Sequence, residues 1–553
     1  MTNGGPIDPA TSPSWAVAGR VVTMDPRSSV VADGAVWVKD AGIAAITKRG
    51  DPTPDGFDNV VPLETGGTIF PGLIELHNHV AYNALPLWQV PQKYTNRDTW
   101  GNSDQYHRLV TAPMKTIGDA TELLPALVRY VECKALVGGV TTTQGIALFS
   151  AAGIRRYYRG IVRNVEETND PLFPEAGSRI ADVDASDPQA FLNEIEKKKC
   201  FLLHLSEGTD QAAHEHFEAL HISGDDWAIA PSLAGIHCVA LQPPDFGVLC
   251  SKGGSMVWSP FSNLLLYGQT ADVGVAKGTG TAQQPFKIGL GSDWSPSGSK
   301  SLLGELRVAH VYSQNNDSVF SDTELVRLAT LEGAEILGWD KLVGSIEVGK
   351  RADLLVVAGQ NDAEPYAPLL HGDERQVQLV SINGTPRFGS PAMMVTDGPD
   401  IESLEVGGQQ RVLYLKQATE DPDVSALSFA QAQANLKDAL LNIKDIRLEQ
   451  ESKQAPGALG AAPDIHAGHA RLALDEFEHT DFTQRPHLPL EGAPTGPTDH
   501  EAAAPAPPIS SLLSPIDLDP LTVADDSGFL ERVAAEMNLP EYLSPGLLAL
   551  YRA

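Results

Sequence analysis

Two histidines end an apolar run near the start of the chain. The stretch FPGLIELHNHV places His77 and His79 on either side of Asn78. In a β-strand, residues i and i+2 project from the same face, so both imidazoles point into one space. Two histidines on an exposed surface would show the same spacing, but here they follow a strand that is apolar enough to be buried. The motif therefore makes both histidines candidate active-site residues.

Three later segments also carry polar side chains in or at the end of apolar runs. They are CFLLHLSEG with His204 and Glu207, LAGIHCVAL with His237, and FKIGLGSDWSPSGS with Asp293. Each segment alone fits a core histidine or a turn-forming aspartate. Together they would bury several polar groups in one region, which is costly unless a metal ion unites them. Imidazoles and a carboxylate suit Zn or Fe, whereas too few oxygens converge for Ca²⁺ or Mg²⁺.

The segment that carries these residues alternates short apolar runs with longer helical patterns. This βα alternation covers residues 66–343, about the length of a (β/α)8 barrel of the TIM type. Seven strands are clear, and the fourth, SRIADVD, is weak. Active sites of such barrels lie at the carboxyl ends of the strands, where all four motifs fall. We therefore predict an α/β fold with a metal-dependent hydrolase barrel.

The segments on both sides of the barrel are expected to form smaller units. Residues 15–65 and 344–390 are rich in β-runs and predict one composite β-sandwich. Residues 391–452 form a C-terminal extension, in which Ser428–Glu451 has the periodicity of one amphipathic helix. Residues 453–553 are a Pro/Ala-rich acidic tail that we expect to be partly disordered. The end of this tail regains Leu, Phe and Tyr, which suits one or two short docked helices.

Composition and charge exclude several classes of protein. The chain has 40 Lys and Arg against 71 Asp and Glu, a net charge of −31. Nucleic acid and anionic membranes both select basic surfaces, so neither is expected as a partner. No apolar stretch is long enough to span a membrane, and the first residues do not resemble a signal peptide. The four cysteines lie at wide, irregular spacings, which is typical of buried thiols in a reducing compartment. We predict a cytoplasmic protein with a small-molecule substrate and leave open assembly as a homo-oligomer.

The ordered set of motifs resembles the amidohydrolase superfamily, the metal-dependent hydrolases that include cytosine, guanine and adenosine deaminases. The resemblance covers residues 15–390. It rests on PGLIELHNH, HLSE, GIHC, WSPFSNLLL, GLGSD and the closing stretch LATLEGAEILGWDKLVGSIEVGKRADLLVV. The resemblance implies that the metal ligands are His77, His79, His204 and Asp293. It makes His237 a further ligand or a hydrogen-bond partner of the attacking hydroxide or substrate.

The resemblance also bears on the number of metal ions. Members with two ions usually bridge them with a carbamylated lysine on the fourth strand, and this chain has no lysine between Lys134 and Lys197. The HLSE segment is similar to the branch that binds one ion. We therefore predict one divalent metal ion, with Glu166 as the alternative ligand for a second.

The catalytic residues follow from the chemistry of such a site. A bound metal lowers the pKa of water towards neutrality and so supplies hydroxide. Asp293 would accept the proton of that water, and Glu207 would protonate the substrate nitrogen, with His237 as the third catalytic candidate. We predict an aminohydrolase (deaminase) that acts on a non-peptide carbon–nitrogen bond of a small substrate such as a heterocycle. Hydrolysis of a cyclic or linear amide, and a catalytically silent metal-binding scaffold, remain alternatives.

Substrate-side candidates lie in two loops and at the end of the seventh predicted strand. The loop after the HNH motif contributes aromatic and basic side chains, WSPFSNLLLYG resembles the family's substrate-side segment, and a serine follows Asp293. The alternative for each of them is ordinary packing. The candidates are Trp88, Arg97, Trp258, Ser262, Asn263 and Ser297.

Overall fold

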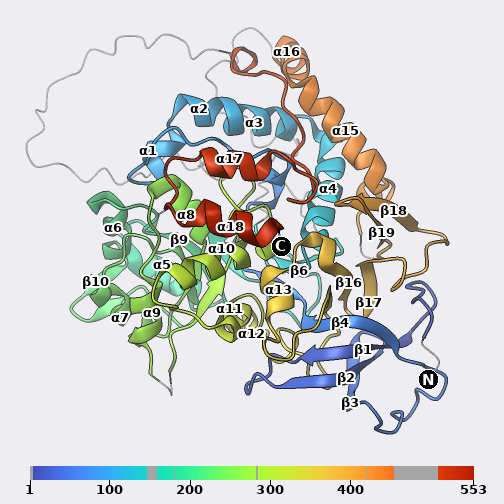
Figure 1. Ribbon diagram of the computed structural model, residues 1–553. Helices are drawn as coiled ribbons and strands as arrows, with labels where there is room; N and C mark the ends of the chain where they lie inside the picture. The colour runs from blue at the N-terminus through green and yellow to red at the C-terminus, as the bar shows by residue number, and fades with distance from the viewer. Residues whose placement is uncertain are drawn as a thin grey trace, which may run out of the picture.

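A computed structural model describes most of the chain. The described residues are 4–145, 157, 160–180, 182–281, 284–418, 420–453 and 508–552. The fold is α/β, with a large sheet at one end and helix-covered parallel strands beside it (Figure 1).

The large sheet combines strands from both flanks of the middle segment. Its order is β18-β19-β17-β16-β15-β4-β1-β2-β3, and β15 pairs antiparallel with β4. All nine strands form one hydrogen-bonded sheet, so the two-layer sandwich stays a prediction. The sheet also extends past residue 390, the expected boundary. The strands are β1 Ser14–Val22, β2 Val30–Lys39, β3 Gly42–Lys48, β4 Leu63–Pro71, β15 Leu354–Ala358, β16 Val377–Ile382, β17 Thr385–Gly389, β18 Ile401–Val406 and β19 Gln409–Tyr414.

Eight parallel strands occupy the middle segment in two sheets. One sheet has the order β5-β6-β7 and the other β14-β13-β12-β9-β8. Most of these strands are buried along their whole length, as expected for parallel strands covered on both faces. The strands are β5 Leu73–Glu75, β6 Val140–Thr143, β7 Arg163–Asn164, β8 Gly177–Arg179, β9 Phe201–Leu205, β12 Leu233–His237, β13 Ser255–Trp258 and β14 Ile288–Leu290.

The two parallel sheets meet at both of their edges. The amide of Leu76, just after β5, donates to the carbonyl of Leu290 in β14 over 3.1 Å. At the other edge, the amide of Ala176 donates to the carbonyl of Val165 over 2.8 Å. These contacts bring the carboxyl ends of all eight strands to one side of the molecule. The weak fourth run of the sequence overlaps the short strand β8.

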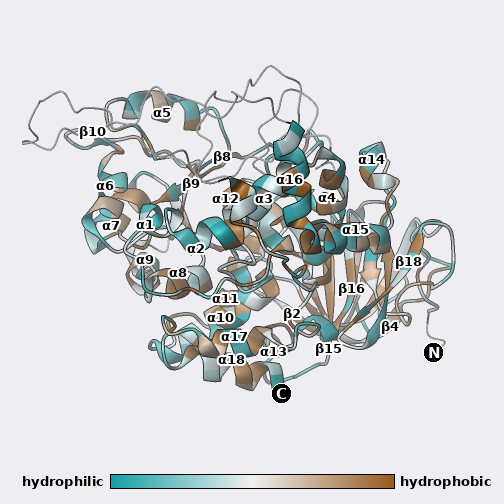
Figure 2. Cartoon of the chain, turned by 90° about the horizontal axis from the view of Figure 1, so that it is seen from above, coloured by the Kyte–Doolittle hydropathy of each residue, from teal (hydrophilic) through white to brown (hydrophobic). Residues whose placement is uncertain are grey.

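Helices follow most of these strands, and their sequences carry the expected start signals. Ser301, for example, caps α10 by accepting a hydrogen bond from the amide of Gly304. Outer helices such as α6 are largely hydrophilic, whereas β16 is largely hydrophobic (Figure 2). The helices of this region are α4 Leu124–Val137, α5 Pro188–Ile195, α6 Gln211–Glu218, α7 Pro243–Ser251, α8 Pro260–Tyr267, α9 Val273–Thr279, α10 Leu302–Asn315, α11 Asp322–Leu328, α12 Leu331–Leu337 and α13 Ala367–His371.

Short elements fill the connections. The long connection from β5 to β6 contains most of them and lies over the carboxyl ends of the strands. They are η1 Val80–Ala84, α1 Arg97–Gly101, α2 Asp104–Tyr106, η2 His107–Thr111, α3 Ala112–Asp119 and η3 Thr121–Leu123, with the hairpin β10 His221–Ser223 and β11 Asp226–Trp227, and with η5 Glu374–Gln376 and α14 Pro422–Ser425 further on.

The expected amphipathic helix over Ser428–Glu451 is two helices, so that prediction is wrong in detail. α15 (Phe429–Leu441) and α16 (Ile443–Lys453) are separated at Asn442. The backbone of Asn442 leaves the helical conformation, with φ of −105° and ψ of 17°, and its side-chain amide donates to the carbonyl of Asp438. The four apolar residues of the pattern are nevertheless buried: Phe429, Leu436, Leu440 and Ile443.

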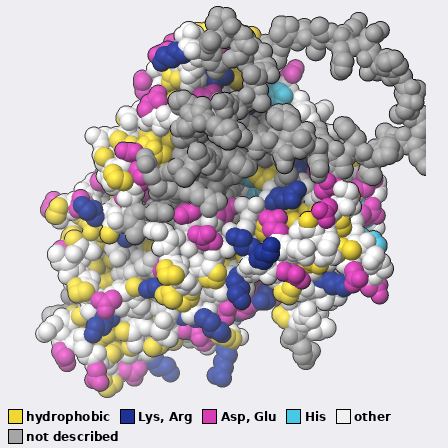
Figure 3. Space-filling model, turned by 180° about the vertical axis from the view of Figure 1, so that it is seen from behind, with side chains coloured by type: hydrophobic (Ala, Val, Ile, Leu, Met, Phe, Trp, Pro, Cys, Tyr) yellow, Lys and Arg dark blue, Asp and Glu magenta, His cyan; other side chains and the backbone are white. Residues whose placement is uncertain are grey.

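The last described residues pack on the helices that cover the parallel strands. The turn η6 (Ile509–Ser511) is followed by α17 (Phe529–Ala535) and α18 (Leu543–Arg552), and α18 packs on α10 (Figure 1). The expectation of disorder between residues 454 and 507 lies outside the described residues. Within the described part of the chain, no helix is both long and apolar enough to cross a bilayer. On the face in Figure 3, the coloured basic side chains are interspersed with acidic and apolar ones.

Candidate metal centre and catalytic pocket

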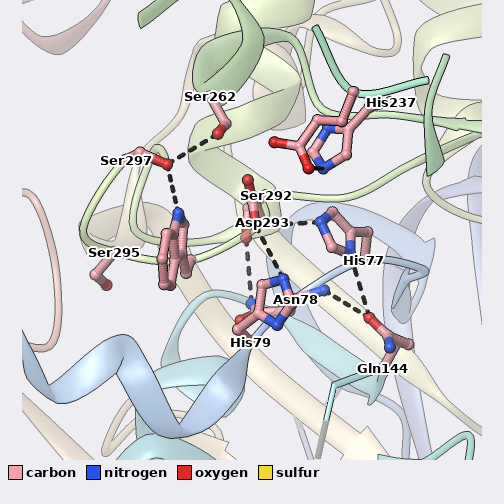
Figure 4. A network of polar contacts seen from close by, with 12 residues as sticks. His77, Asn78, His79, Gln144, His237, Ser262, Ser292, Asp293, Ser295 and Ser297 are labelled. Carbon is pink, nitrogen blue, oxygen red and sulfur yellow. Dashed lines mark hydrogen bonds and ion pairs between the residues drawn. The ribbon is translucent and has the colours of Figure 1, made fainter. Parts of the chain in front are cut away.

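Five residues from four strands meet at the carboxyl ends of the parallel sheets. His77 and His79 follow β5, His204 lies in β9, His237 ends β12, and Asp293 follows β14. All five side chains are buried. Figure 4 shows the rings of His77 and His79 turned towards Asp293. The structure therefore brings the predicted ligands together, although 216 residues (293 − 77) separate the first from the last.

The distances within the cluster are those of a ligand set. Asp293 Oδ1 lies 3.1 Å from His77 Nε2 and 3.4 Å from His79 Nε2. The ring centroid of His77 lies 4.7 Å from that of His204 and 4.9 Å from that of His237. Two overlapping groups each place three ligand atoms within 4.8 Å of one another. One group is His77, His204 and His237, and the other is His77, His79 and Asp293.

Backbone contacts fix Asp293 against the HNH motif. The amide of Asp293 donates to the carbonyl of His77 over 3.0 Å, and the amide of His79 donates to the carbonyl of Asp293 over 2.6 Å. Asp293 and His237 have φ angles of 66° and 68°, in the left-handed region that non-glycine residues rarely adopt. Such strain persists where the surroundings over-determine the conformation, which is common at functional sites.

Burial favours the neutral form of three imidazoles of the cluster. Burial lowers the pKa of His77, His204 and His237, and neighbouring imidazoles lower the pKa of the latter two further. Burial alone would raise the pKa of Asp293, but His77, His237 and His79 outweigh it and hold the pKa below its usual value. Neutral imidazoles and an ionised carboxylate are the states in which these side chains bind metals.

Two amide side chains orient the histidines. The Asn263 side chain, on α8, lies with its Nδ2 2.9 Å from His237 Nδ1, and Asn263 Oδ1 accepts a hydrogen bond from Thr270. With Asn263 donating, the neutral His237 ring carries its proton on Nε2. On the other side, Gln144 Oε1 lies 3.4 Å from His77 Nδ1 and accepts from the amide of Asn78 over 3.0 Å. Such contacts fix the tautomer and direction of the ring.

Glu207 lies beside the cluster, between His237 and Tyr267. Its Oε2 lies 3.7 Å from His237 Nε2, and its Oε1 accepts a hydrogen bond of 2.8 Å from the hydroxyl of Tyr267. Burial raises the pKa of Glu207 to about 7, partly opposed by the charge of Arg97. A carboxyl group with this pKa can hold a proton near neutral pH and release it, which suits a general acid.

These residues line one narrow cavity between the strand ends and the β5–β6 connection. It encloses about 240 Å³ of space between atoms, including space open to solvent. Trp100 and Trp294 form an aromatic wall, with ring centroids 6.1 Å apart. Such a cavity, apolar on one side with a few convergent polar groups, is typical of small-molecule sites. The lining residues are His79, Arg97, Trp100, Ile180, His204, Glu207, His237, Asp293 and Trp294.

Of the six predicted substrate residues, Arg97 lies on the cavity wall. Its guanidinium donates to the carbonyl of Ile180 over 2.8 Å and to Asp182 over 3.2 Å. Trp88 and Trp258 are buried in the hydrophobic core, and the indole of Trp258 donates a hydrogen bond to the hydroxyl of Thr270. Substrate contact by these two residues stays a prediction.

The other three candidates contact residues of the cavity or one another and are absent from the cavity lining. Ser262 and Ser297 are buried, with their hydroxyls 2.8 Å apart, and Ser297 accepts a hydrogen bond from the Trp294 indole. Asn263 orients His237 as described above. Substrate contact by these residues also stays a prediction.

The candidate residues predicted from the sequence did not include Trp100, Ile180 and Trp294 of the cavity lining, or Tyr267, which contacts Glu207. Tyr267 stands at the end of the WSPFSNLLLYG segment, and only the folding of α8 brings its hydroxyl to Glu207. Trp294 directly follows the predicted ligand Asp293, and this adjacency was the one signal available. Glu166, the alternative second-metal ligand, instead accepts hydrogen bonds from Gln144, the amide of Gly145 and Ser178.

The donor set fits a divalent metal ion. Nδ1 of the buried His204 has no hydrogen-bond partner among the described residues, and an unsatisfied buried nitrogen is costly. The buried imidazoles, the carboxylate of Asp293 and the short distances between them suit a metal that prefers nitrogen and oxygen ligands.

The sequence profile of the amidohydrolase family matches residues 68–387 of the chain. The chain belongs to the amidohydrolase family. The resemblance read from the motifs is thereby confirmed, and the protein is placed among hydrolases that act on carbon–nitrogen bonds other than peptide bonds.

Curated relatives of this amidohydrolase are deaminases. The 5-methylthioadenosine/S-adenosylhomocysteine deaminase of Symbiobacterium thermophilum is 23% identical over 423 residues, covering 69% of this chain and 91% of the relative. The 5'-deoxyadenosine deaminase of Methanosarcina mazei is 22% identical and covers 70% and 90%.

Solved structures show the same fold. An adenosine deaminase from Xanthomonas campestris with bound zinc superposes with a TM-score of 0.54 at 20% identity, covering 71% of this chain and 96% of the other. Atrazine chlorohydrolase from Arthrobacter aurescens TC1 with zinc superposes with a TM-score of 0.55 at 18% identity, covering 69% and 97%. At these identities the likeness concerns the fold.

Proposed function

We propose that this amidohydrolase is a metal-dependent deaminase that acts on an aminated, flat nitrogen heterocycle. The observation that carries the proposal is Glu207, which lies in the same cavity as the metal-ligand cluster with a pKa raised to about 7. A proton donor beside a metal centre is what the expulsion of ammonia from a heterocycle requires. The names of the curated relatives support the same chemistry.

We infer that the metal is one zinc ion held by His77, His79, His204 and Asp293. Zinc in both neighbouring solved structures supports zinc over iron. Glu166 is engaged with Gln144, Gly145 and Ser178, which supports a single ion. When bound, the metal supplies Lewis acidity and lowers the pKa of water.

The chain's own groups then move the protons. Asp293 is placed to accept the proton of the attacking water, because its carboxylate stays ionised in the cluster. Glu207, in its protonated form, donates to the ring nitrogen as water adds to the carbon. The proton taken by Asp293 then passes to the amino group, which leaves as ammonia. As the carbonyl forms, the remaining proton of the added hydroxyl passes to Glu207 and restores its protonated form. His237 Nε2 faces the same space and is oriented as a hydrogen-bond donor by Asn263.

The cavity walls favour a planar substrate. Trp294 and Trp100 offer aromatic surface beside the ligand cluster, and Arg97 adds a charge at its edge. We infer an adenine-type purine, free or as a nucleoside, as the first substrate class to test. We also propose that the eight parallel strands form a closed (β/α)8 barrel, supported by the backbone contacts at both sheet edges. Four buried, unpaired cysteines support a cytoplasmic location.

Ammonia release from a substrate panel tests this proposal. The panel contains adenosine, 5'-deoxyadenosine, 5-methylthioadenosine, S-adenosylhomocysteine, guanine, cytosine and aminated triazines, together with cyclic and linear amides. Deamination of at least one heterocycle, lost in Glu207→Gln and kept in the exposed control Glu215→Gln, is the expected result. Turnover of amides alone would select the amide-hydrolase alternative. Metal binding without any turnover would select the catalytically silent scaffold.

A further inference from the structure

The C-terminal segment places a buried carboxylate against two buried lysines under the metal centre. Asp519 is fully buried, and its two carboxylate oxygens pair with Lys134 on α4 and with Lys300 in the loop after Asp293. Lys300 also pairs with Asp526 over 2.9 Å. Each lysine side chain is 1% exposed, so neither ammonium has water to solvate it.

The backbone of Asp519 is fixed to the same region. Its amide donates to the carbonyl of Ala84 over 3.0 Å, and its carbonyl accepts from the hydroxyl of Tyr130. Asp519 therefore ties the β5–β6 connection to α4 through its main chain and to the Asp293 loop through its side chain.

From Lys134 the contacts continue to the metal ligands. Lys134 Nζ donates to the carbonyl of Asn83 and to Ser295 Oγ, both over 2.9 Å. The amide of Ser295 donates to the Asn83 side chain over 2.8 Å, and Asn83 Nδ2 donates to Asn78 Oδ1 over 3.0 Å. Asn78 stands between His77 and His79, and Ser295 stands two residues after Asp293. The two loops that carry ligands are thus joined by a network that begins at Asp519.

The buried charges of Lys134, Lys300 and Asp519 stabilise one another as ion pairs. Burying an ammonium without a partner is strongly unfavourable, and removing one member of a buried ion cluster leaves such a charge. Burial lowers the pKa of Lys134 to about 8, while the charge of Asp519 acts to raise it. Lys300 has a φ of 72°, so its loop is held in a strained conformation by these contacts.

Other residues of the segment reach neighbouring loops of the pocket. Glu536 accepts a hydrogen bond from the amide of Val90 over 3.3 Å, and Asn538 Nδ2 donates to the carbonyls of Gln92 and Leu265, each over 2.9 Å. The segment 508–552 lies outside residues 68–387, the region matched by the amidohydrolase profile. Asp519 therefore reaches the matched region from outside it, whereas its partners Lys134 and Lys300 lie within it.

We propose that Asp519 is a positioning residue of the metal site. By pairing with Lys134 and Lys300, it fixes the HNH loop (residues 77–84) and the Asp293 loop (residues 291–301) relative to each other. The inference rests on the proposed function, because it assigns the two loops to a metal-dependent site. The residue acts through Lys134, Ser295 and Asn83 and touches neither metal nor substrate.

The test compares full-length Asp519→Asn with Asp517→Asn, an exposed aspartate two residues earlier. Hydrogen–deuterium exchange of the metal-free proteins is read for residues 77–84 and 291–301. Retention of zinc against a chelator is measured on the metal-loaded proteins. We expect exchange at least tenfold faster in both loops and zinc retention at least tenfold weaker in Asp519→Asn. The Asp517 control should match wild type.

Loop exchange and zinc retention equal to wild type in a folded Asp519→Asn protein would overturn the proposal, whatever its melting temperature. If Asp519→Asn does not fold, Asp519→Glu decides, since it keeps the charge but moves the carboxylate. Faster exchange confined to the two loops supports the positioning role, and wild-type exchange contradicts it. The exchange measurement needs no substrate and no metal. A wild-type protein that binds no zinc and shows no turnover would refute the proposed function. The exchange measurement on the metal-free proteins would still decide whether Asp519 positions the two loops.

Discussion

Glu207 Oε2 lies 3.7 Å from His237 Nε2, although the two residues belong to different strand ends and are 30 positions apart (237 − 207). The parallel pairing of β9 and β12 produces this closeness, because it places Ile236 opposite His204 and His237 opposite Leu205. The pair links the metal-ligand cluster to the proposed proton donor, and the predictions below address its members.

Replacing Glu207 with Gln should lower kcat by about 10²–10⁴-fold, the usual contribution of general acid–base catalysis. The amide keeps the shape of the side chain and still accepts from Tyr267 but cannot donate an acidic proton. Zinc per chain should stay at the wild-type value, as measured by elemental analysis. A kcat within threefold of wild type would remove Glu207 from the mechanism.

Replacing Asp293 with Asn should affect both turnover and metal. The variant loses the ionised carboxylate that faces His77 and His79, so we expect kcat to fall by at least about 10³-fold and zinc binding to weaken. Ammonia release and chelator competition check these two effects, with the exposed Asp226→Asn as control. Normal turnover by Asp293→Asn contradicts its assigned role.

Removing the metal should destabilise the protein as well as inactivate it. A ligand that binds only the folded state stabilises it by about 2.7 kcal/mol at a hundredfold excess over Kd. We therefore expect a lower melting temperature after chelation, restored with activity by about one equivalent of zinc. Restoration that needs two equivalents would indicate a second ion.

Trp294→Ala should raise KM more than it lowers kcat. Stacking of a base on an aromatic side chain contributes roughly 1–3 kcal/mol, or about 5–150-fold in binding. Trp294→Phe keeps an aromatic face and should recover part of the loss. An unchanged KM in Trp294→Ala would show that the substrate does not contact this wall.

Glu305 predicts a pH dependence of stability. Burial raises its pKa to about 8, while the amide of Phe261 and the hydroxyl of Ser299 partly oppose this shift. Between its unfolded value near 4.5 and its folded value near 8, the unfolded state binds fewer protons than the folded state. Stability contributed by the neutral carboxyl is therefore present at low pH and lost as pH rises through this window.

Replacing Glu305 with Gln tests this dependence. The variant cannot ionise, so its melting temperature should fall less between pH 5 and pH 8 than that of wild type. Thermal unfolding at several pH values measures the difference. Parallel curves for the two proteins would show that Glu305 is not protonated in the folded state.

The sequence by itself predicted the candidate ligands and the strands that bring them together. An HxH motif after an apolar strand, and His204, His237 and Asp293 in later strands, are local patterns with a fixed geometric meaning. Because parallel strands align their carboxyl ends, these patterns were enough to predict that the five residues meet. Family-like motifs added the reaction class.

Only the tertiary structure decided what surrounds the cluster. The break at Asn442 is a local change of backbone conformation that the hydrophobic periodicity does not reveal. The contact of Tyr267 with Glu207 depends on how α8 packs over the strand ends. Asp519 lies 219 residues after Lys300, and no local pattern relates them. Such partners are chosen by the requirement that every buried charge be paired, and that requirement acts on the folded chain as a whole.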